Sequence, residues 1–311
     1  GVGGNLGTPA LALLDDDVSL YVLELSSFQL ERAGNLGLAV ACVLNVSPDH
    51  LDRHGSMPRY HQAKHRIFRG CRKAVVNPDD PLTVPLVGQE VEILNWRMGE
   101  PPLGGFGLRR IDGHEMLCHG FEPLIGVIEL GMVGRHNVAN ALAALALGHA
   151  AGLPDAAMCD ALRQFQGLPH RCERVSRLGD VDWVNDSKAT NVGATEAALS
   201  GLGGNSNILL IAGGQGKGAD FAALRHLVGR HCRAVILMGE DAPALAAVLD
   251  GAAPIEQVQG MDEAVARAYA LAQPGDTVLL SPACASFDMF EGFAQRGRAF
   301  TDAVRALGGP A

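Results

Sequence analysis

Residues 207–221 read NILLIAGGQGKGADF, an apolar run followed directly by a glycine-rich loop that carries Lys217. A short continuous apolar run bounded by turn residues is typical of a strand buried on both faces of a parallel sheet. Four similar runs, each followed by a helical stretch, are at residues 181–185, 234–238, 255–258 and 277–281. This alternation predicts a doubly wound parallel sheet, in which ligands bind at the carboxyl ends of the strands.

The segment Gly167-Leu168-Pro169 interrupts this pattern, and we place a domain boundary there, between residues 1–168 and 169–311. The first domain also alternates strand and helix signals, which predicts an α/β fold. Its expected strands are at residues 20–25, 39–45 and 73–77, and its expected helices are at residues 59–69, 136–151 and 154–165. Residues 81–130 are rich in turns and predict a small β layer. Thr8 and Pro9 predict the N-cap and first residue of a further helix.

Composition limits the possible functions. The chain has 311 residues, of which 48% are hydrophobic and 19% charged, and its net charge of −9 gives no electrostatic support to nucleic-acid binding. No apolar run approaches the roughly 20 residues that a membrane span needs. The seven cysteines form no CxxC pair, which indicates free thiols and a cytoplasmic location. We expect a monomer without nucleic-acid or membrane partners.

Polar side chains follow two of the expected strands in the first domain. Glu24 and Ser26 end one strand, and His50 follows the next between two acids. A carboxylate at such a sheet edge suits Mg²⁺, which takes one or two oxygen ligands from protein. The alternatives are a helix cap at Ser26 or Ser27 and an ordinary turn around Pro48.

Two helices of the first domain carry further candidates. Lys64 lies between His61 and His65, which share a helix face and have the spacing of a zinc pair. No third ligand follows at a suitable spacing, so we discount zinc there. Asn137 and Asn140 lie three residues apart at a helix start, where their amides can read an adenine edge or one of them can cap the helix.

The segment 185–191 is the most specific, because its strand-to-helix loop holds an acid, a cation and hydroxyl groups together. Helix N-termini bind anions, and a purely structural loop seldom needs both Asp186 and Lys188. Arg171 lies beside the domain boundary, and its guanidinium can bind a phosphate through bidentate hydrogen bonds. The alternative for Arg171 is a surface ion pair.

The loops after the other two central strands complete the pattern. The loop with Lys217 is not a Walker A motif, because Gly218 stands where Ser or Thr is required, and it is better interpreted as a cradle for a substrate carboxylate. Ser286 begins a helix after residues 277–281 and can bind a small acid. Cys284 as a nucleophile has only its closeness to a helix start in its favour.

In order, these segments resemble the Mur ligase family, and among its members those that add D-glutamate. The matching stretches are GVGGNLGTPAL, LELSSFQLE, LNVSPDHLDRH, the helix with Lys64, GRHNVANALAALA, GLPHRCE, VNDSKATNVGATEAAL, AGGQGKGADF and LLSPACASFDMFEGFAQRG. They span nearly the whole chain. The resemblance implies a central ATPase-type α/β domain, incomplete at its start, followed by a Rossmann-like C-terminal domain. It also implies peptidoglycan precursor synthesis, with ATP and Mg²⁺ as cofactors and UDP-N-acetylmuramoyl-L-alanine and D-glutamate as substrates.

The resemblance further implies roles for individual residues. The ligands of Mg²⁺ are Glu24, His50 and Lys64, the last as a carbamate. The residues that contact the nucleotide are Asn137, Asn140, Arg171 and Asp186. The residues that contact the two substrates are Asn5, Ser26, Thr190, Lys217, Ser286, Phe287 and Phe293. The catalytic residues are Lys64, His50 and Lys188.

One feature of the family is missing from residues 1–311. The phosphate-binding loop of the GxxGKST type is expected to precede Gly1, so we expect this polypeptide to be part of a longer protein and to have little ligase activity alone. Two alternatives remain open at this point. One is a non-catalytic module that binds D-glutamate, and the other is a relative of the folylpolyglutamate synthases.

Overall fold

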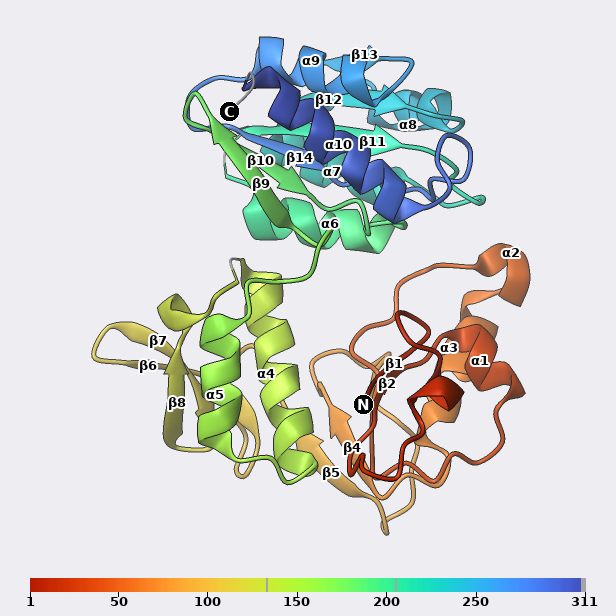
Figure 1. Ribbon diagram of the computed structural model, residues 1–311, viewed down its shortest axis with the longest axis vertical. Helices are drawn as coiled ribbons and strands as arrows, with labels where there is room; N and C mark the ends of the chain where they lie inside the picture. Colours follow the sequence, from red (N-terminus) through yellow and green to blue (C-terminus); the bar gives the residue numbers. More distant parts are fainter. Residues whose placement is uncertain (133, 205, 309–311) are drawn as a thin grey trace. The chain divides into compact units, whose positions relative to one another are not determined.

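The computed structural model describes residues 1–132, 134–204 and 206–308. The chain forms two compact units (Figure 1). Unit 1 comprises residues 1–46, 53–130 and 138–163, and unit 2 comprises residues 47–52, 131–137 and 164–311. Among the described residues, no helix is both long enough and apolar enough to cross a membrane.

Unit 2 is built on a six-stranded sheet with the order β13-β12-β11-β14-β10-β9. Its strands are β9 (Glu173–Leu178), β10 (Val181–Asn185), β11 (Ile208–Gly213), β12 (Cys232–Met238), β13 (Ile255–Gln257) and β14 (Thr277–Leu280). The five strands expected from the sequence are present and pair in parallel. The sixth, β9, was not expected and pairs antiparallel with β10 at the edge of the sheet.

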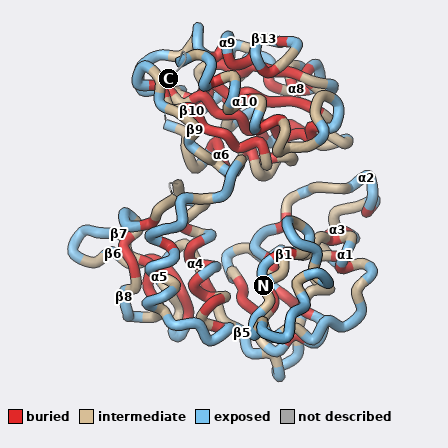
Figure 2. Tube along the Cα trace, in the orientation of Figure 1, coloured by how far each residue is buried: buried red, intermediate tan, exposed pale blue. Residues whose placement is uncertain are grey.

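Helices cover both faces of this sheet, which confirms the doubly wound prediction. One face packs against α6 (Val192–Leu202), α7 (Ala222–His231) and α8 (Ala242–Leu249), and the other packs against α9 (Met261–Leu271) and α10 (Phe293–Leu307). Successive side chains of a strand point to opposite faces. In β11, accordingly, Leu210 joins the first of these cores and Leu209 the second, and the buried strands run through the middle of the unit in Figure 2. Each such side chain contributes about 1.5–3 kcal/mol by leaving water.

The direction of the connections fixes where a ligand can bind in unit 2. The chain leaves β10 and β11 through α6 and α7 on one face, and it leaves β14 toward α10 on the other face. The neighbours β11 and β14 are therefore followed by helices on opposite faces, which opens a crevice at their carboxyl ends. The loops singled out in the sequence, 186–191, 213–218 and 281–286, all lie at this edge.

Unit 1 contains short parallel sheets and a small antiparallel one. Strand β1 (Val2–Gly4) pairs with β2 (Val22–Glu24), and β4 (Lys73–Val76) lies between β3 (Val40–Cys42) and β5 (Glu92–Asn95). The expected β layer is present as β6 (Phe106–Ile111), β7 (His114–His119) and β8 (Glu122–Gly126). The helices of the first half of the chain are α1 (Ser27–Arg32), α2 (Leu51–His54), α3 (Met57–His65), α4 (Arg135–Ala150) and α5 (Asp155–Gln164).

The helix expected after Thr8 is a single 3-10 turn, Ala10–Leu13, and Thr8 is not its N-cap. Pro9 occupies the cap position and makes no side-chain capping bond. The carbonyl oxygen of Thr8 instead accepts a 2.9 Å hydrogen bond from the backbone NH of Gly4. Leu14 then takes an extended conformation, so the helix cannot continue beyond one turn.

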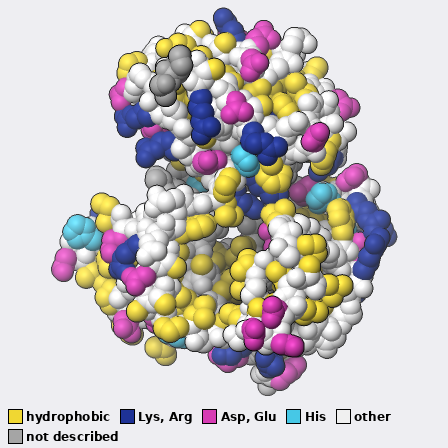
Figure 3. Space-filling view, in the orientation of Figure 1, with side chains coloured by type: hydrophobic (Ala, Val, Ile, Leu, Met, Phe, Trp, Pro, Cys, Tyr) yellow, Lys and Arg dark blue, Asp and Glu magenta, His cyan; other side chains and the backbone are white. Residues whose placement is uncertain are grey.

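The expected free thiols are present, because all seven cysteines are unpaired. Figure 3 shows Lys and Arg side chains among Asp and Glu side chains on both units, on the face that it draws.

Candidate functional site

Two loops at the carboxyl edge of the sheet in unit 2 pair with each other. Gln215, after β11, and Ala285, after β14, exchange two backbone hydrogen bonds of 2.9 Å and form an antiparallel bridge. The NH of Gly213 also donates to the carbonyl oxygen of Pro282, at 2.9 Å. The glycine-rich loop is thus held against the last strand by its own backbone.

Glycine is required at position 214 of this loop. Its φ is +124°, and a Cβ atom there would lie 2.2 Å from the carbonyl oxygen of Ala285. Lys217 also has a left-handed backbone, with φ of 54°. The side chain of Asp241 accepts a 2.6 Å hydrogen bond from the NH of Gly216, so the loop is anchored at the residue directly before Lys217.

The three loops are joined by Arg296, whose side chain is buried on α10 with 1% of its surface exposed. Its Nη2 donates to the carbonyl oxygen of Ser187 at 2.8 Å, and its Nε donates to the Ser187 hydroxyl at 3.0 Å. Its Nη1 donates to the carbonyl oxygen of Cys284 at 3.1 Å, with Gly213 and Ala285 oxygens at 3.5 and 3.4 Å. Burial lowers the pKa of Arg296 to about 10, so the guanidinium remains a cation near neutral pH.

The sequence interpretation gave no role to Arg296, although a signal was present. Arg296, Phe300 and Val304 follow one another at intervals of four residues, and all three are buried on one face of α10. A charged residue on the apolar face of a helix indicates a buried polar partner, because an unpaired buried charge is costly.

Asn185, at the end of β10, is a second buried residue to which the sequence interpretation gave no role of its own. Its amide nitrogen contacts His170 Nδ1 and donates to the carbonyl oxygen of Gly297, both at 3.0 Å. Its side-chain oxygen accepts a 3.2 Å bond from the NH of Ser187. Asn185 therefore fixes the start of the loop that carries Asp186 and Lys188.

The residues expected to contact D-glutamate lie on these loops or shortly after the last of them, and they differ in exposure. Phe293, the first residue of α10, has its ring centroid 4.7 Å from Nζ of Lys188, which was expected to be catalytic. Ser286 is buried, with 2% exposed, while Thr190 and Lys217 are half-buried. Phe287, by contrast, is 68% exposed. The parts that all these residues play at the site remain predictions.

Asp186 is buried at the same edge and carries two hydrogen bonds. One carboxylate oxygen accepts from the Ser281 hydroxyl at 2.9 Å, and the other accepts from the NH of Cys172 at 3.2 Å. Burial raises the pKa of Asp186 to about 6, although these bonds and the nearby Arg171 oppose the rise. Arg171 itself is exposed.

The raised pKa of Asp186 predicts a pH dependence of stability. The folded protein holds the Asp186 proton more tightly than the unfolded chain, whose pKa is about 3.8. The contribution of Asp186 to the free energy of unfolding is therefore fully present below pH about 4 and is lost as the pH rises through about 6. We expect Asp186→Asn, which stays neutral, to remove this dependence and to raise the free energy of unfolding at pH 7 by about 2 kcal/mol.

The measurement is urea unfolding at a series of pH values between 4 and 7, with Asp302→Asn as the matched control. Asp302 is exposed on α10, so its substitution leaves the pH dependence as it is. An Asp186→Asn protein that lost stability in parallel with the wild type as the pH rose would contradict the assignment.

Cys284 is not suited to act as a nucleophile. It is fully buried, and burial raises the pKa of its thiol to about 12. A thiol rather than a thiolate is therefore present near neutral pH, and the thiolate is the reactive form.

In unit 1, Glu24 is exposed at the end of β2, and its carboxylate accepts a 3.4 Å hydrogen bond from the Asn5 amide. Ser26 is the N-cap of α1, as in the structural alternative considered above. Its hydroxyl accepts from the NH of Gln29, and the Gln29 side chain accepts from the Ser26 NH. Such a capping box holds the residues beside Glu24 in place.

The remaining expected residues of the first half of the chain occupy helices and a strained turn. Lys64 lies on α3, with Nζ 5.2 Å from the ring centroid of Tyr60. Asn137 and Asn140 both lie on α4. His50 has a left-handed backbone with φ of 53°, and its NH donates to the Asp49 carboxylate at 2.9 Å.

His61 and His65 both direct Nε2 at the carbonyl oxygen of Leu82, at 3.0 and 2.8 Å. Neither belongs to a cluster of three metal-ligating side chains in the part of the chain that the structure describes.

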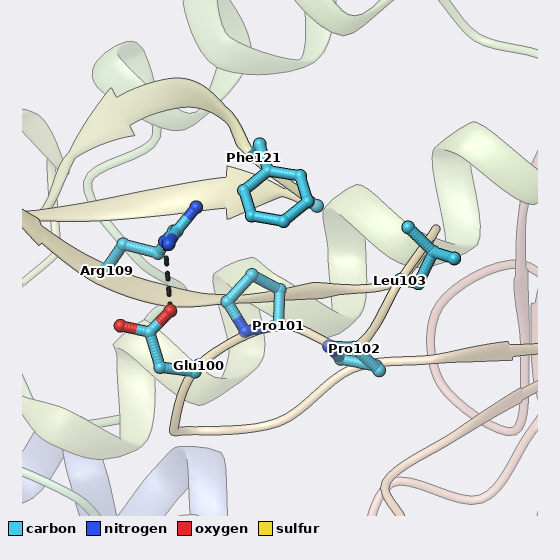
Figure 4. A pocket seen from close by; sticks show the side chains of 7 residues that line it. Glu100, Pro101, Pro102, Leu103, Arg109 and Phe121 are labelled. Atoms are coloured by element: carbon cyan, nitrogen blue, oxygen red, sulfur yellow. Dashed lines mark ion pairs between the residues drawn. The ribbon is translucent and has the colours of Figure 1, made fainter.

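A hollow of about 90 Å³ lies on unit 1 (Figure 4). Its walls include Pro101, Leu103 and Phe121. Arg109 lies beside it, 2.9 Å from the Glu100 carboxylate and 4.8 Å from the ring centroid of Phe121. The charge of Arg109 is thus already paired with a residue of the same hollow. None of the expected site residues lines this hollow.

The sequence model of the Mur ligase middle domain matches residues 5–148, and that of the Mur ligase glutamate ligase domain matches residues 170–284. The chain belongs to the Mur ligase family. Among Mur ligases it is 54% identical over 308 residues to the UDP-N-acetylmuramoylalanine–D-glutamate ligase of Pseudomonas syringae pv. tomato, covering 98% of this chain and 69% of that protein. The corresponding ligase of Pseudomonas aeruginosa is 55% identical with the same coverage.

Solved structures of a Mur ligase and of other ligases share the fold at low sequence identity. The ligase MurC of Thermotoga maritima has a TM-score of 0.61 and 18% identity, over 92% of this chain and 64% of that one. A pseudomurein peptide ligase type C of Methanothermus fervidus has a TM-score of 0.66 and 17% identity, over 92% and 68%. A bifunctional folylpolyglutamate synthase/dihydrofolate synthase of Yersinia pestis also shares the fold. Its TM-score is 0.64 and its identity 20%, over 93% of this chain and 66% of that one. The much higher sequence identity places the chain with the D-glutamate ligases.

Proposed function

We propose that this chain carries the D-glutamate-adding step in the assembly of a peptidoglycan precursor. The acceptor is UDP-N-acetylmuramoyl-L-alanine. ATP transfers its terminal phosphoryl group to the acceptor carboxylate, which gives an acyl phosphate and ADP. The amine of D-glutamate then attacks the acyl carbon, the new C–N bond forms, and the bond to phosphate breaks. The amine loses a proton in this step.

The main support for this proposal is the group of three loops that Arg296 joins at the carboxyl edge of the sheet in unit 2. Lys217 supplies a cation on a turn that is anchored by Asp241 and by the Ala285 bridge. Ser286 supplies a hydroxyl beside the same bridge. A cation and a hydroxyl on fixed loops suit a small dicarboxylate, because charge-assisted hydrogen bonds are strong and directional. Thr190 and the two rings Phe287 and Phe293 complete the proposed pocket.

We propose the residues that bind the nucleotide and the metal ion because the chain belongs to the Mur ligase family. Asn137 and Asn140 take the adenine, and Arg171 and Asp186 line the nucleotide. Glu24, His50 and Lys64 as a carbamate would hold Mg²⁺, and the exposed carboxylate of Glu24 fits the preference of this ion for oxygen. Bound Mg²⁺ would neutralise charge on the transferring phosphoryl group. Asn5 and Ser26 take the UDP-linked acceptor.

The residues of this chain contribute positioning and charge to the reaction. Lys188, beside Phe293, offers a cation to the phosphoryl oxygens of the acyl phosphate. Lys217 holds D-glutamate so that its amine faces the acyl carbon, and orientation of this kind lowers the entropic part of the barrier. We propose that the reaction takes place in the cytoplasm, as expected from the unpaired cysteines.

Calorimetry of the chain with D-glutamate and with L-glutamate tests this function. We expect D-glutamate to bind more tightly, because a pocket that fixes two carboxylates and an amine distinguishes the two hands. A preference for L-glutamate would count against the proposed function and would favour an activity like that of the folylpolyglutamate synthases. Equal binding of both isomers would also contradict it.

A further inference from the structure

Three side chains on unit 1 have the chemistry of metal ligands and belong to none of the expected ligase residues. His119 is the last residue of β7, His149 lies in the last turn of α4, and Asp155 begins α5. One ligand atom from each lies within 4.8 Å of the others. Three separate elements therefore bring two imidazoles and a carboxylate to one point.

The turn between α4 and α5 fixes the separation of His149 and Asp155. The NH of Gly152 donates to the carbonyl oxygen of His149, and the NH of Leu153 donates to that of Gly148, both at 2.9 Å. Gly152 has a φ of +83°. These two bonds form a Schellman motif, which ends the helix sharply and reverses the chain. As a result, Nδ1 of His149 lies 3.4 Å from the carboxylate of Asp155.

Ring packing places the two histidine side chains against each other and against a buried phenylalanine. The His119 ring stacks on Phe106 with centroids 4.5 Å apart and planes 4° from parallel. The His149 ring meets His119 edge-on at 4.4 Å and Phe106 at 5.5 Å, and Phe106 is fully buried. Nε2 of His119 is 3.2 Å from the carbonyl oxygen of Gly104. If Nε2 donates there, Nδ1 keeps its lone pair, which is the usual arrangement of a metal-binding histidine.

We propose that His119, His149 and Asp155 form a binding site for a borderline divalent transition metal, and specifically for Zn²⁺. Metal–ligand distances of about 2.0–2.2 Å place two ligands of a tetrahedral Zn²⁺ roughly 3.3 Å apart. The His149–Asp155 separation of 3.4 Å already matches this value. Small side-chain rotations bring His119 into the shell, and water takes the fourth position. The bound ion joins the end of β7 to the α4–α5 turn.

A simple ion pair does not account for the third side chain. His149 and Asp155 have 39% and 34% of their side chains exposed. A pair so accessible to water contributes only about 0–1 kcal/mol to stability. It does not require a second imidazole beside it, whereas imidazole and carboxylate groups together are a common ligand set for Zn²⁺. The site does not depend on the proposed ligase function.

The test is a titration of the metal-free chain with Zn²⁺ against a chromophoric chelator, in excess Mg²⁺. Mg²⁺ fills sites that are lined by oxygen and leaves imidazole sites open. We expect about one Zn²⁺ to bind per chain. His149→Gln and Asp155→Asn each remove a ligand and should weaken binding by at least about a hundredfold, since loss of an outer-shell partner alone costs about 10- to 100-fold. Neither substitution is expected to disrupt the helix that carries it. If one variant nevertheless fails to fold, the other still tests the site.

Two control variants locate the ion. His114→Gln changes an exposed histidine on the same strand as His119, and His65→Gln removes half of the His61–His65 pair. Both should bind Zn²⁺ like the wild type. Titration with Co²⁺ should give absorption bands of nitrogen and oxygen ligation, without the sulfur charge-transfer band that a cysteine site would give. The proposal is overturned if the wild type does not bind Zn²⁺, if His149→Gln binds unchanged, or if His65→Gln abolishes binding.

Discussion

Replacement of Arg296 by Met is expected to lower the free energy of unfolding of unit 2 by about 3–5 kcal/mol. The guanidinium donates to the Ser187 and Cys284 carbonyl oxygens and to the Ser187 hydroxyl in a fully buried place. Methionine fills similar space but donates nothing, so these acceptors lose their partners without gaining water. Each buried polar group left without a partner costs about 1–3 kcal/mol.

Tryptophan fluorescence during urea unfolding measures this loss in unit 2 alone. In a Trp96→Phe background, the remaining Trp183 is fully buried in unit 2 and packs against Phe300 of α10. Arg298→Met is the matched control, because Arg298 lies on the same helix and is exposed. Equal stability of the Arg296 and Arg298 variants would show that the guanidinium does not hold the three loops together. Arg296→Lys should be intermediate, since one ammonium cannot span all these acceptors.

The sequence predicted the parallel strands of unit 2 because their burial is continuous. Strand β11 is buried along its whole length, so every residue is apolar or small, and the run is visible without knowledge of its neighbours. Strand β9 was missed for the opposite reason. Its two exposed residues, Arg174 and Arg177, are separated by two half-buried ones, so no regular alternation is visible, and its place at the sheet edge depends on pairing with β10. That pairing is a property of the folded chain.

The chemically distinctive residues of the site could also be found from the sequence. Lys188, Lys217 and Ser286 follow buried strands, and parallel strands bring their carboxyl ends to one edge. The residues that hold these loops were harder to find. Arg296 is 109 residues from Ser187, its partner, and the sequence does not say which loop a buried helix face meets. The cluster of His119, His149 and Asp155 likewise has no motif spacing.

Removal of the charge at Lys217 is expected to weaken D-glutamate binding by about thirtyfold to a hundredfold. This factor corresponds to about 2–3 kcal/mol, the range for a hydrogen bond to a charged group. Lys217→Asn is the suitable variant. The residue at this position has φ of 54°, and asparagine adopts the left-handed region more readily than most residues, so the turn is kept while the cation is lost. Calorimetry with D-glutamate gives the affinity.

Two further variants show whether D-glutamate affinity depends on the cation at position 217 or only on the net charge of the protein. Lys217→Arg keeps the cation and should retain most of the affinity. Lys73→Met removes a cation of β4 in unit 1, where Lys73 pairs with Glu92 at 3.3 Å, and should leave affinity unchanged. Because Lys217 is only half-buried, Lys217→Asn should alter unfolding by no more than about 0.5 kcal/mol. Unchanged affinity in Lys217→Asn would place the D-glutamate carboxylate elsewhere on unit 2, whereas equal losses in Lys217→Asn and Lys73→Met would indicate only a long-range effect of net charge.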